Sequence, residues 1–214
     1  MKSLAIKARQ TEDGIEILLR GSKYTLQYPD TIWRDYPKDA RDVLFDNLVY
    51  AETVHLPLTL RKRELKYEIS PPYFQTYFFQ NMVYDLPSCA DVDGTKTSEL
   101  LKEFMNVKTT FSNNEIKFPS HMEETREDSS VVSISFGKDS LLTWAVCREL
   151  GLNPQLCYVV EPLLTYEEKH KMVLAEDFNK EFGVKLNKIV HTAGHLRDGI
   201  RLGVGKTEIG WGLQ

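Results

Sequence analysis

VVSISFGKDSLLTWAVCREL, residues Val131–Leu150, is the stretch that decides the fold. Its first six residues, Val131–Phe136, are mostly apolar and β-branched, which is typical of a buried strand. Asp139–Leu150 has the pattern of a helix, and Gly151 follows it as a stop signal. A turn that carries a lysine, an aspartate and two serines therefore joins a strand to a helix.

The same alternation continues further along the chain. Leu156–Val160 is an apolar strand, Thr165–Phe182 is a helix that ends before Gly183, and Leu186–Val190 is another strand. Strand–helix–strand units of this length need crossover helices, so we expect three neighbouring parallel strands. In such sheets, ligands bind where the strands end and the loops lead into helices. The turn with the lysine and the aspartate lies at that edge.

The chain before this unit has a different organisation. Leu4–Arg20 contains two strands on either side of the turn TEDG, and KYTLQY (23–28) predicts a third strand. Helical spacing of apolar residues begins at Asp39, and LKYEIS (65–70) indicates a further strand. We therefore expect a hairpin-rich, smaller α+β domain over residues 1–125.

A long helix is predicted from the segment PYFQTYFFQNMVYDL (72–86). We expect this helix to dock on the core through its aromatic face, which consists of Tyr73, Phe74, Tyr77, Phe78 and Tyr84. A surface that stacks nucleic-acid bases would place Arg and Lys between the aromatic residues, and this segment has neither. A core role is therefore favoured over base stacking.

The polar, acidic segment PSHMEETREDSS (119–130) has the composition of a linker or exposed loop. We place a domain boundary there and expect the second domain over residues 126–214. The three strands predicted for this domain make a thin sheet. The first domain, a partner subunit or further chain would complete it, which leaves a homodimer among the open alternatives.

The composition is that of a globular protein. The chain has 214 residues, of which 42% are hydrophobic and 27% charged. A formal net charge of -4 gives no electrostatic reason for the whole surface to bind nucleic acid. No run approaches the roughly 18 to 20 apolar residues that span a bilayer, so we expect a cytoplasmic protein without a membrane partner. The cysteines, Cys89, Cys147 and Cys157, lack metal-binding spacing and are expected to be reduced and structural.

The turn SFGKDS (135–140) has the residues of a phosphate site. A helix N-terminus offers unpaired N–H groups and a partial positive charge, and Lys138 adds a mobile cation. Gly137 permits a left-handed backbone or a close approach, while Ser135 and Ser140 supply hydroxyl groups. Asp139 beside a polyphosphate is suited to holding Mg²⁺. The alternative is that Asp139 or Ser140 only caps the helix, which would explain one residue of the set.

This turn, after an apolar strand and before a helix, resembles the S-G-G-x-D-S loop of the PP-loop, or N-type, ATP pyrophosphatases, a superfamily that includes tRNA-modifying enzymes and 7-cyano-7-deazaguanine synthases. The resemblance covers about residues 130–192. It implies an α/β fold with a parallel nucleotide-binding sheet, preceded here by the α+β domain. It also implies ATP and Mg²⁺ as cofactors, with phosphates and metal held by Ser135, Phe136, Gly137, Lys138, Asp139 and Ser140. The chain departs from the pattern at Phe136, where the superfamily usually has a glycine.

The resemblance further implies that the edge of the adenine base meets the backbone at the ends of the first two strands, near Ile134 and near Val159, Val160 and Glu161. Glu161 is equally consistent with a plain strand terminus.

The reaction implied by the resemblance is adenylation of a carbonyl or carboxylate oxygen, with release of pyrophosphate. Lys138 would stabilise charge on the phosphates and Asp139 would orient the metal, so these two residues are the candidate catalytic groups. The substrate is a small molecule or tRNA. One alternative keeps the fold but uses a cell-wall or other small carboxylate precursor. Another is a nucleotide-binding regulatory or scaffold module without turnover.

Two other patterns near the end of the sequence are weaker indications of a functional site. Gly205, Lys206 and Thr207 resemble the end of a Walker A motif, but the preceding glycine spacing and the polar context do not fit. His191 and His195 are four residues apart, which suits a metal only on a helix, and the intervening Gly194 disfavours one.

Overall fold

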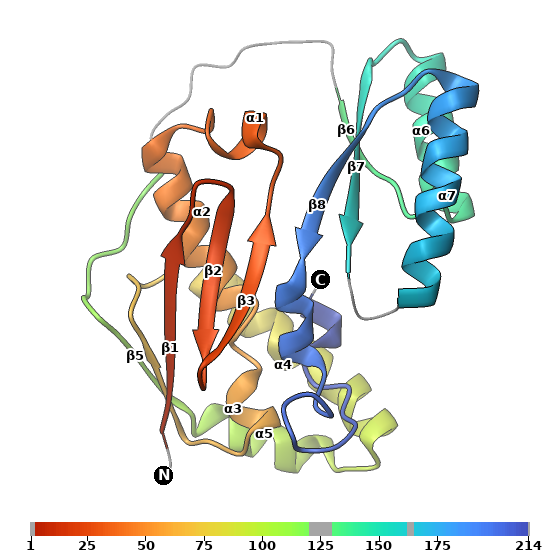
Figure 1. Cartoon of the computed structure of the whole chain (residues 1–214). Coiled ribbons are helices and arrows are strands. Elements are labelled where there is room, and N and C mark those ends of the chain that lie inside the picture. The colour runs from red at the N-terminus through yellow and green to blue at the C-terminus, as the bar shows by residue number, and fades with distance from the viewer. Residues whose placement is uncertain (1–2, 120–129, 162–164, 214) are drawn as a thin grey trace.

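The computed structural model describes residues 3–119, 130–161 and 165–213. It has one mixed sheet of eight strands in the order β5-β4-β1-β2-β3-β8-β7-β6, with helices packed around it (Figure 1). Of the seven neighbouring strand pairs in this described sheet, four are parallel and three antiparallel. The predicted α/β class is confirmed. No helix within the described ranges combines the length and apolar character needed to cross a membrane.

The carboxy-terminal unit has the predicted alternation of strands and helices. Its elements are β6 (Ser130–Ser133), α6 (Lys138–Glu149), β7 (Pro154–Val160), α7 (Thr165–Phe182) and β8 (Leu186–His191). The pairs β6–β7 and β7–β8 are both parallel, as predicted. The first strand is shorter than expected, although Ile134 N still donates to Cys157 O at 2.8 Å. Gly151 and Gly183 follow the two helices with φ of 71° and 66°, as expected of C-terminal stop signals.

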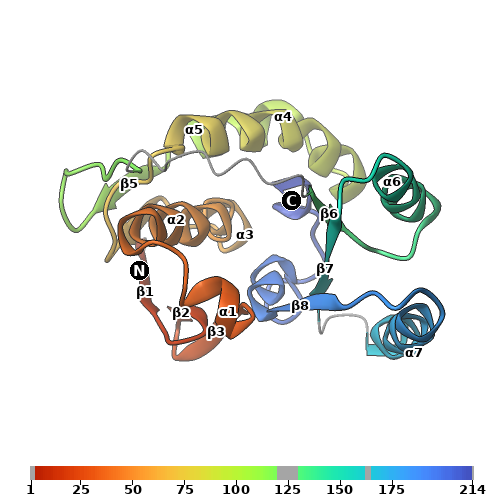
Figure 2. The same cartoon turned by 90° about the horizontal axis from the view of Figure 1, so that it is seen from above.

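Both helices of this unit lie on one side of its three strands (Figure 2). A crossover helix returns the chain to the start of the next parallel strand in a right-handed sense, and two such units in succession place both helices on one face. The buried side chains between the strands and the helices form a small core of their own, which consists of Val132, Ile134, Trp144, Leu156 and Phe178.

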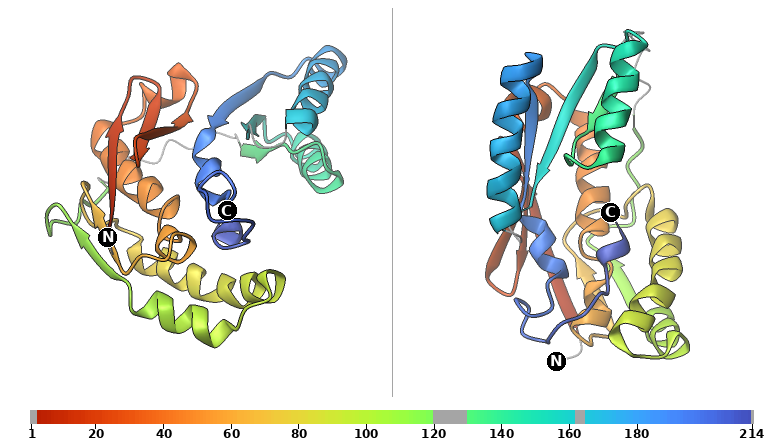
Figure 3. Two further views of the ribbon diagram at one scale, coloured as in Figure 1. Left: turned by 60° about the horizontal axis from the view of Figure 1, so that its bottom comes forward. Right: turned by 90° about the vertical axis from the view of Figure 1, so that its right-hand side faces the viewer.

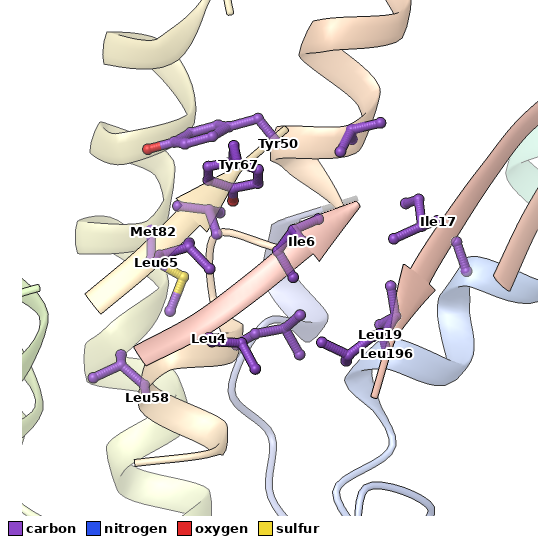
Figure 4. Packing of buried hydrophobic residues seen from close by; sticks show 14 of the residues in the cluster. Leu4, Ile6, Ile17, Leu19, Tyr50, Leu58, Leu65, Tyr67, Met82 and Leu196 are labelled. Atoms are coloured by element: carbon purple, nitrogen blue, oxygen red, sulfur yellow. The ribbon is translucent and has the colours of Figure 1, made fainter. Parts of the chain in front are cut away.

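The amino-terminal portion contains the predicted hairpins. Its elements are β1 (Ser3–Gln10), β2 (Gly14–Leu19), β3 (Ser22–Gln27), α1 (Asp30–Trp33), α2 (Lys38–Ala51), α3 (Leu56–Thr59), β4 (Glu64–Tyr67), α4 (Gln75–Asp93), α5 (Thr97–Met105) and β5 (Lys108–Phe111). Alternating apolar residues of β1 and β2 face the helices and form a second, larger core (Figure 4). The expectation that this portion is the smaller of the two is therefore wrong. The residues labelled in that view are Leu4, Ile6, Ile17, Leu19, Tyr50, Leu58, Leu65, Tyr67, Met82 and Leu196.

The orientation of α4 differs from the prediction. The helix exists, and Phe78 packs against the larger core as predicted. Tyr73, Phe74, Tyr77 and Tyr84 are exposed, so the expectation that these four dock on the core is wrong. The fully buried side chains of this helix are Met82, Leu86, Cys89 and Ala90, and Phe78 and Phe79 pack beside them. Both faces of this helix are apolar, so the 3.6-residue period alone does not decide which one is buried. Tyrosine tolerates the surface because its hydroxyl group remains hydrated.

The two portions meet where β3 pairs with β8. This antiparallel ladder contains only two residue pairs, Leu26 with His191 and Gln27 with Val190. Thr25 N donates to Thr192 Oγ1 at 2.6 Å and adds one link. The three parallel strands are thus extended by the amino-terminal portion, the first of the alternatives considered for the thin sheet. The division at residues 125 and 126 stays a prediction, because the proposed boundary lies outside the described residues.

The segment after β8 returns to the amino-terminal portion. It contains the 3₁₀ helices η1 (Thr192–Arg197) and η2 (Trp211–Leu213), and it lies alongside α4 (Figure 3). Leu196 is fully buried in the larger core. In the Gly-Lys-Thr stretch, Thr207 Oγ1 donates to Asp93 Oδ2 at 2.6 Å. This threonine therefore joins the tail to α4.

Candidate functional site

The loop after β6 is a compact turn held by its own serines. Ser135 N donates to Ser140 Oγ at 3.2 Å, and Ser140 Oγ donates to Gly137 O at 3.0 Å. Gly137 is the N-cap residue of α6, and the helix start has no side-chain capping bond. Neither Asp139 nor Ser140 therefore caps this helix with its side chain, contrary to the capping alternative. Ser140 instead closes the loop.

Phe136 takes the conformation that glycine was expected to take. Its φ is 60°, in the left-handed region, whereas Gly137 is extended with φ -81°. Of the two uses that the sequence allowed for Gly137, the left-handed backbone is taken by Phe136 instead. A left-handed φ costs a bulky residue roughly 1–2 kcal/mol. The ring offsets part of this cost, because it packs against the smaller core, with its centroid 6.0 Å from that of Phe178 in that core and 6.0 Å from that of Tyr158.

Lys138 and Asp139 lie in the first turn of α6 and are exposed. Backbone N–H groups of a first helical turn have no partner within the helix, and they make the local potential positive. Within the described ranges, neither side chain takes part in a salt bridge shorter than 4.0 Å. The loop thus presents a cation, a carboxylate and N–H donors to the solvent.

The residues of this loop fit magnesium held jointly with phosphate. Asp139 offers one carboxylate, and Mg²⁺ commonly takes one or two carboxylates together with phosphate oxygens and water. The described residues contain no group of three or more His, Cys, Asp or Glu placed to hold a metal by themselves. A metal at this loop would therefore need the ligand's own oxygens.

Val160 and Glu161 lie at the same sheet edge as the loop. Because β6, β7 and β8 are parallel, their carboxyl ends meet there. Val160 ends β7 and pairs with Val190 of β8, and Glu161 is the next residue. The structure therefore places these two predicted adenine-site residues one strand away from the loop, while Pro162, which follows them, lies outside the described residues.

The carboxylate of Glu161 belongs to a partly buried group that we call the seam cluster: Glu52, Glu161, His191 and Arg197. Glu161 Oε1 lies 3.2 Å from His191 Nδ1 and accepts from Arg197 Nη2 at 2.8 Å. His191 Nε2 lies 3.0 Å from Glu52 Oε1. The Arg197 guanidinium sits 5.2 Å from the Trp211 ring centroid, in a cation–π arrangement. The cluster joins the end of α2 to the ends of β7 and β8.

Burial alone would lower the pKa of His191, but hydrogen bonds to Glu161 and Glu52 outweigh it and raise the pKa to about 9. His191 therefore carries a proton at neutral pH, and both of its ring nitrogens face carboxylates. This arrangement also argues against the alternative in which His191 and His195 bind a metal, because a protonated imidazole has no lone pair for one.

Sequence reasoning missed Glu52 and Arg197 as members of this group. Glu52 and His191 are separated by 139 positions, so no local spacing could indicate their contact. Arg197 lies in the polar stretch after the last predicted strand, and it belongs to no motif that would mark it. The pairing of β8 with both β3 and β7, together with the packing of η1, brings these residues together.

A separate surface hollow of about 680 Å³ lies near the turn after β1. It is lined by Gln10, Thr11, Glu12, Asp30, Arg34 and Arg41. None of these residues belongs to the predicted site, and the hollow is wide and open. We give more weight to the loop after β6, where specific donors and charges converge at the edge of parallel strands.

Comparison with known proteins assigns no family to the chain. No protein-family model matches it, and neither a curated protein nor a solved structure is significantly similar.

Proposed function

We propose that the chain binds Mg–ATP at residues 135–140 and adenylates a carbonyl or carboxylate oxygen of a substrate, with release of pyrophosphate. One observation carries the proposal: a phenylalanine is held in a left-handed conformation at the carboxyl end of a parallel strand, one residue before a helix N-cap. Backbone strain at a bulky residue clusters at active sites and ligand clamps. Ser135 N and Gly137 N donate to serine hydroxyls within the loop, so the donors offered to a ligand are those of the first turn of α6, at the edge where parallel sheets bind ligands.

Each exposed group of the loop has a role in this proposal. The N–H groups of the first turn of α6 hold phosphate oxygens, and Lys138 balances the charge that grows on the leaving pyrophosphate. Asp139 holds the metal, and magnesium, when bound, neutralises charge on the phosphates. Glu161 and the end of β7 lie beside the nucleoside. Ser135 and Ser140 maintain the loop through their mutual hydrogen bonds.

The test is titration calorimetry with Mg–ATP, followed by measurement of pyrophosphate release with candidate substrates. We expect Asp139→Asn to change the free energy of unfolding by roughly less than 1 kcal/mol, the usual scale for a surface substitution. Pyrophosphate release should fall by orders of magnitude, because the amide lacks the charge that the metal requires. Lys138→Ala should weaken both binding and turnover, because the cation acts on ground and transition states alike.

Asp177→Asn is the matched control, since this exposed carboxylate lies on α7 in the same unit. It should alter neither binding nor turnover. An Asp139→Asn protein that turns over normally would disprove the proposed mechanism. ATP binding without any pyrophosphate release, across substrates, would instead identify a nucleotide-binding scaffold.

A further inference from the structure

Both ring nitrogens of His191 point at carboxylate oxygens, at 3.2 Å for Glu161 and 3.0 Å for Glu52. A neutral imidazole has only one N–H, so it would present a lone pair to one of these carboxylates. Both contacts are favourable only when the ring is protonated. The charge of Glu52 therefore helps to retain the proton through which His191 holds Glu161.

Glu161 is held from a second direction as well. Arg197, whose side chain is only 3% exposed, donates to the same oxygen that faces His191. Trp211 lies against the guanidinium and limits its movement. The Glu161 carboxylate is thus placed by one residue at the end of β8 and one in η1, and indirectly by Glu52 after α2.

The position of Glu161 matters because β7 is the neighbour of β6. Strands in a sheet lie about 4.8 Å apart, so the end of β7 borders the loop at which we place the nucleotide. Glu52 follows α2, in the amino-terminal portion. The seam cluster is therefore a physical link between that portion and the edge of the sheet that carries the loop.

We propose that Glu52 is a positioning residue for the nucleotide site: through His191 it holds Glu161 in place, so the amino-terminal portion sets the affinity for Mg–ATP. This inference rests on the proposed function. The charged groups that face His191 are Glu52, Glu161 and Arg197, with His195 nearby. Tyr28 faces Glu52 and has its pKa raised to about 12 by burial and by that carboxylate, so it stays neutral throughout the test.

The experiment compares Mg–ATP titrations of the whole chain, Glu52→Gln and Glu99→Gln at pH 7.5. Glu99 is the matched control, because it is an exposed glutamate of the amino-terminal portion in an ion pair with Lys96. We expect Glu52→Gln to raise the Kd about tenfold, within the usual range of coupling between sites. Glu99→Gln should leave the Kd unchanged.

A pH series separates positioning from a merely structural role. In the unmodified chain, the Kd should rise as the pH increases from 7.5 to 9.5 and His191 loses its proton. Glu52→Gln should move this rise to lower pH, because one of the two carboxylates that retain the proton is gone. A residue that only stabilised the fold would not shift the pH at which affinity changes.

Each remaining outcome counts against the inference. If the chain binds Mg–ATP and Glu52→Gln binds it equally well, the inference alone is overturned. If the unmodified chain does not bind Mg–ATP, the proposed function fails and the inference fails with it. If Glu52→Gln does not fold, the pH series of the unmodified chain and of Glu99→Gln still tests the inference. An affinity for Mg–ATP that is independent of pH from 7.5 to 9.5 would overturn the positioning role.

Discussion

At the scale of single residues, His55 should make stability depend on pH. Burial lowers its pKa to about 4, and its hydrogen bond to Leu196 O only partly opposes this effect. Between pH 6.5 and 4 the unfolded chain binds a proton that the folded chain excludes, so the free energy of unfolding falls as the pH falls. The loss should reach roughly 2–3 kcal/mol, at 1.36 kcal/mol for each pKa unit.

Urea unfolding at several pH values between 4.5 and 7 would measure this loss, with His55→Gln as the reference. The amide keeps a donor for Leu196 O but does not titrate. The difference in stability between the two proteins should narrow as the pH falls. A difference that is constant between pH 5 and 6.5 would show that His55 does not resist protonation.

Gly210 should not tolerate a side chain. Its φ is 92°, and an added Cβ would lie 2.5 Å from Cγ of His55, closer than real contacts permit. We expect Gly210→Ala to reduce the free energy of unfolding by roughly 2–4 kcal/mol, from overpacking together with the left-handed backbone. Gly203→Ala is the control: its φ is 78° but no atom lies within 4 Å, so roughly 1–2 kcal/mol is expected from the backbone alone. Equal losses in thermal or urea unfolding would contradict the clash with His55.

At the scale of secondary-structure elements, Phe178 holds α7 against α6 and the loop. Its ring centroid lies 4.6 Å from that of Trp144 and 6.0 Å from that of Phe136. Phe178→Ala should cost roughly 3–5 kcal/mol, the range for phenylalanine to alanine changes in cores. Because Phe136 loses part of its support, Mg–ATP affinity should fall as well.

Tyr166→Ala is the comparison for this change, since Tyr166 lies on the same helix and is 88% exposed. It should alter the unfolding free energy by roughly 0.5 kcal/mol or less. Calorimetric unfolding and Mg–ATP titration of both variants would check the two effects. A Phe178→Ala protein with unchanged nucleotide affinity would contradict the role of this core in supporting the loop.

At the scale of the whole molecule, a substitution that destabilises one of the two hydrophobic cores should affect the other core less. The two cores share no buried residue, and the ladder that joins β3 to β8 has only two residue pairs. In Phe178→Ala, amide hydrogen exchange should accelerate over residues 130–191 more than over residues 3–27. Mass spectrometry of deuterated peptides would measure this difference. An equal acceleration in both regions would indicate that the chain opens as a single cooperative unit.

The local pattern of the sequence was sufficient to predict much of the fold. The three parallel strands, the helix over Thr165–Phe182 and the opening hairpins follow from apolar periodicity and from glycine stop signals, which act over a few residues. The loop SFGKDS was placed correctly at the end of a strand for the same reason. The nucleotide at that loop stays a proposal, because sequence and backbone geometry indicate a kind of site without identifying its ligand.

The sequence by itself determined where the strands and helices of the carboxy-terminal unit and the opening hairpins form, since hydrogen bonding and side-chain period within an element are local. It did not predict α1, α3, α5 or β5. Only the tertiary structure decided which apolar face of α4 is buried, that β3 pairs with β8, and that Phe136 rather than Gly137 is left-handed. It alone brought Glu52 to His191 across 139 positions. The physical reason is that these outcomes depend on packing between distant segments, and neither residue spacing nor intrinsic propensity contains information about that packing.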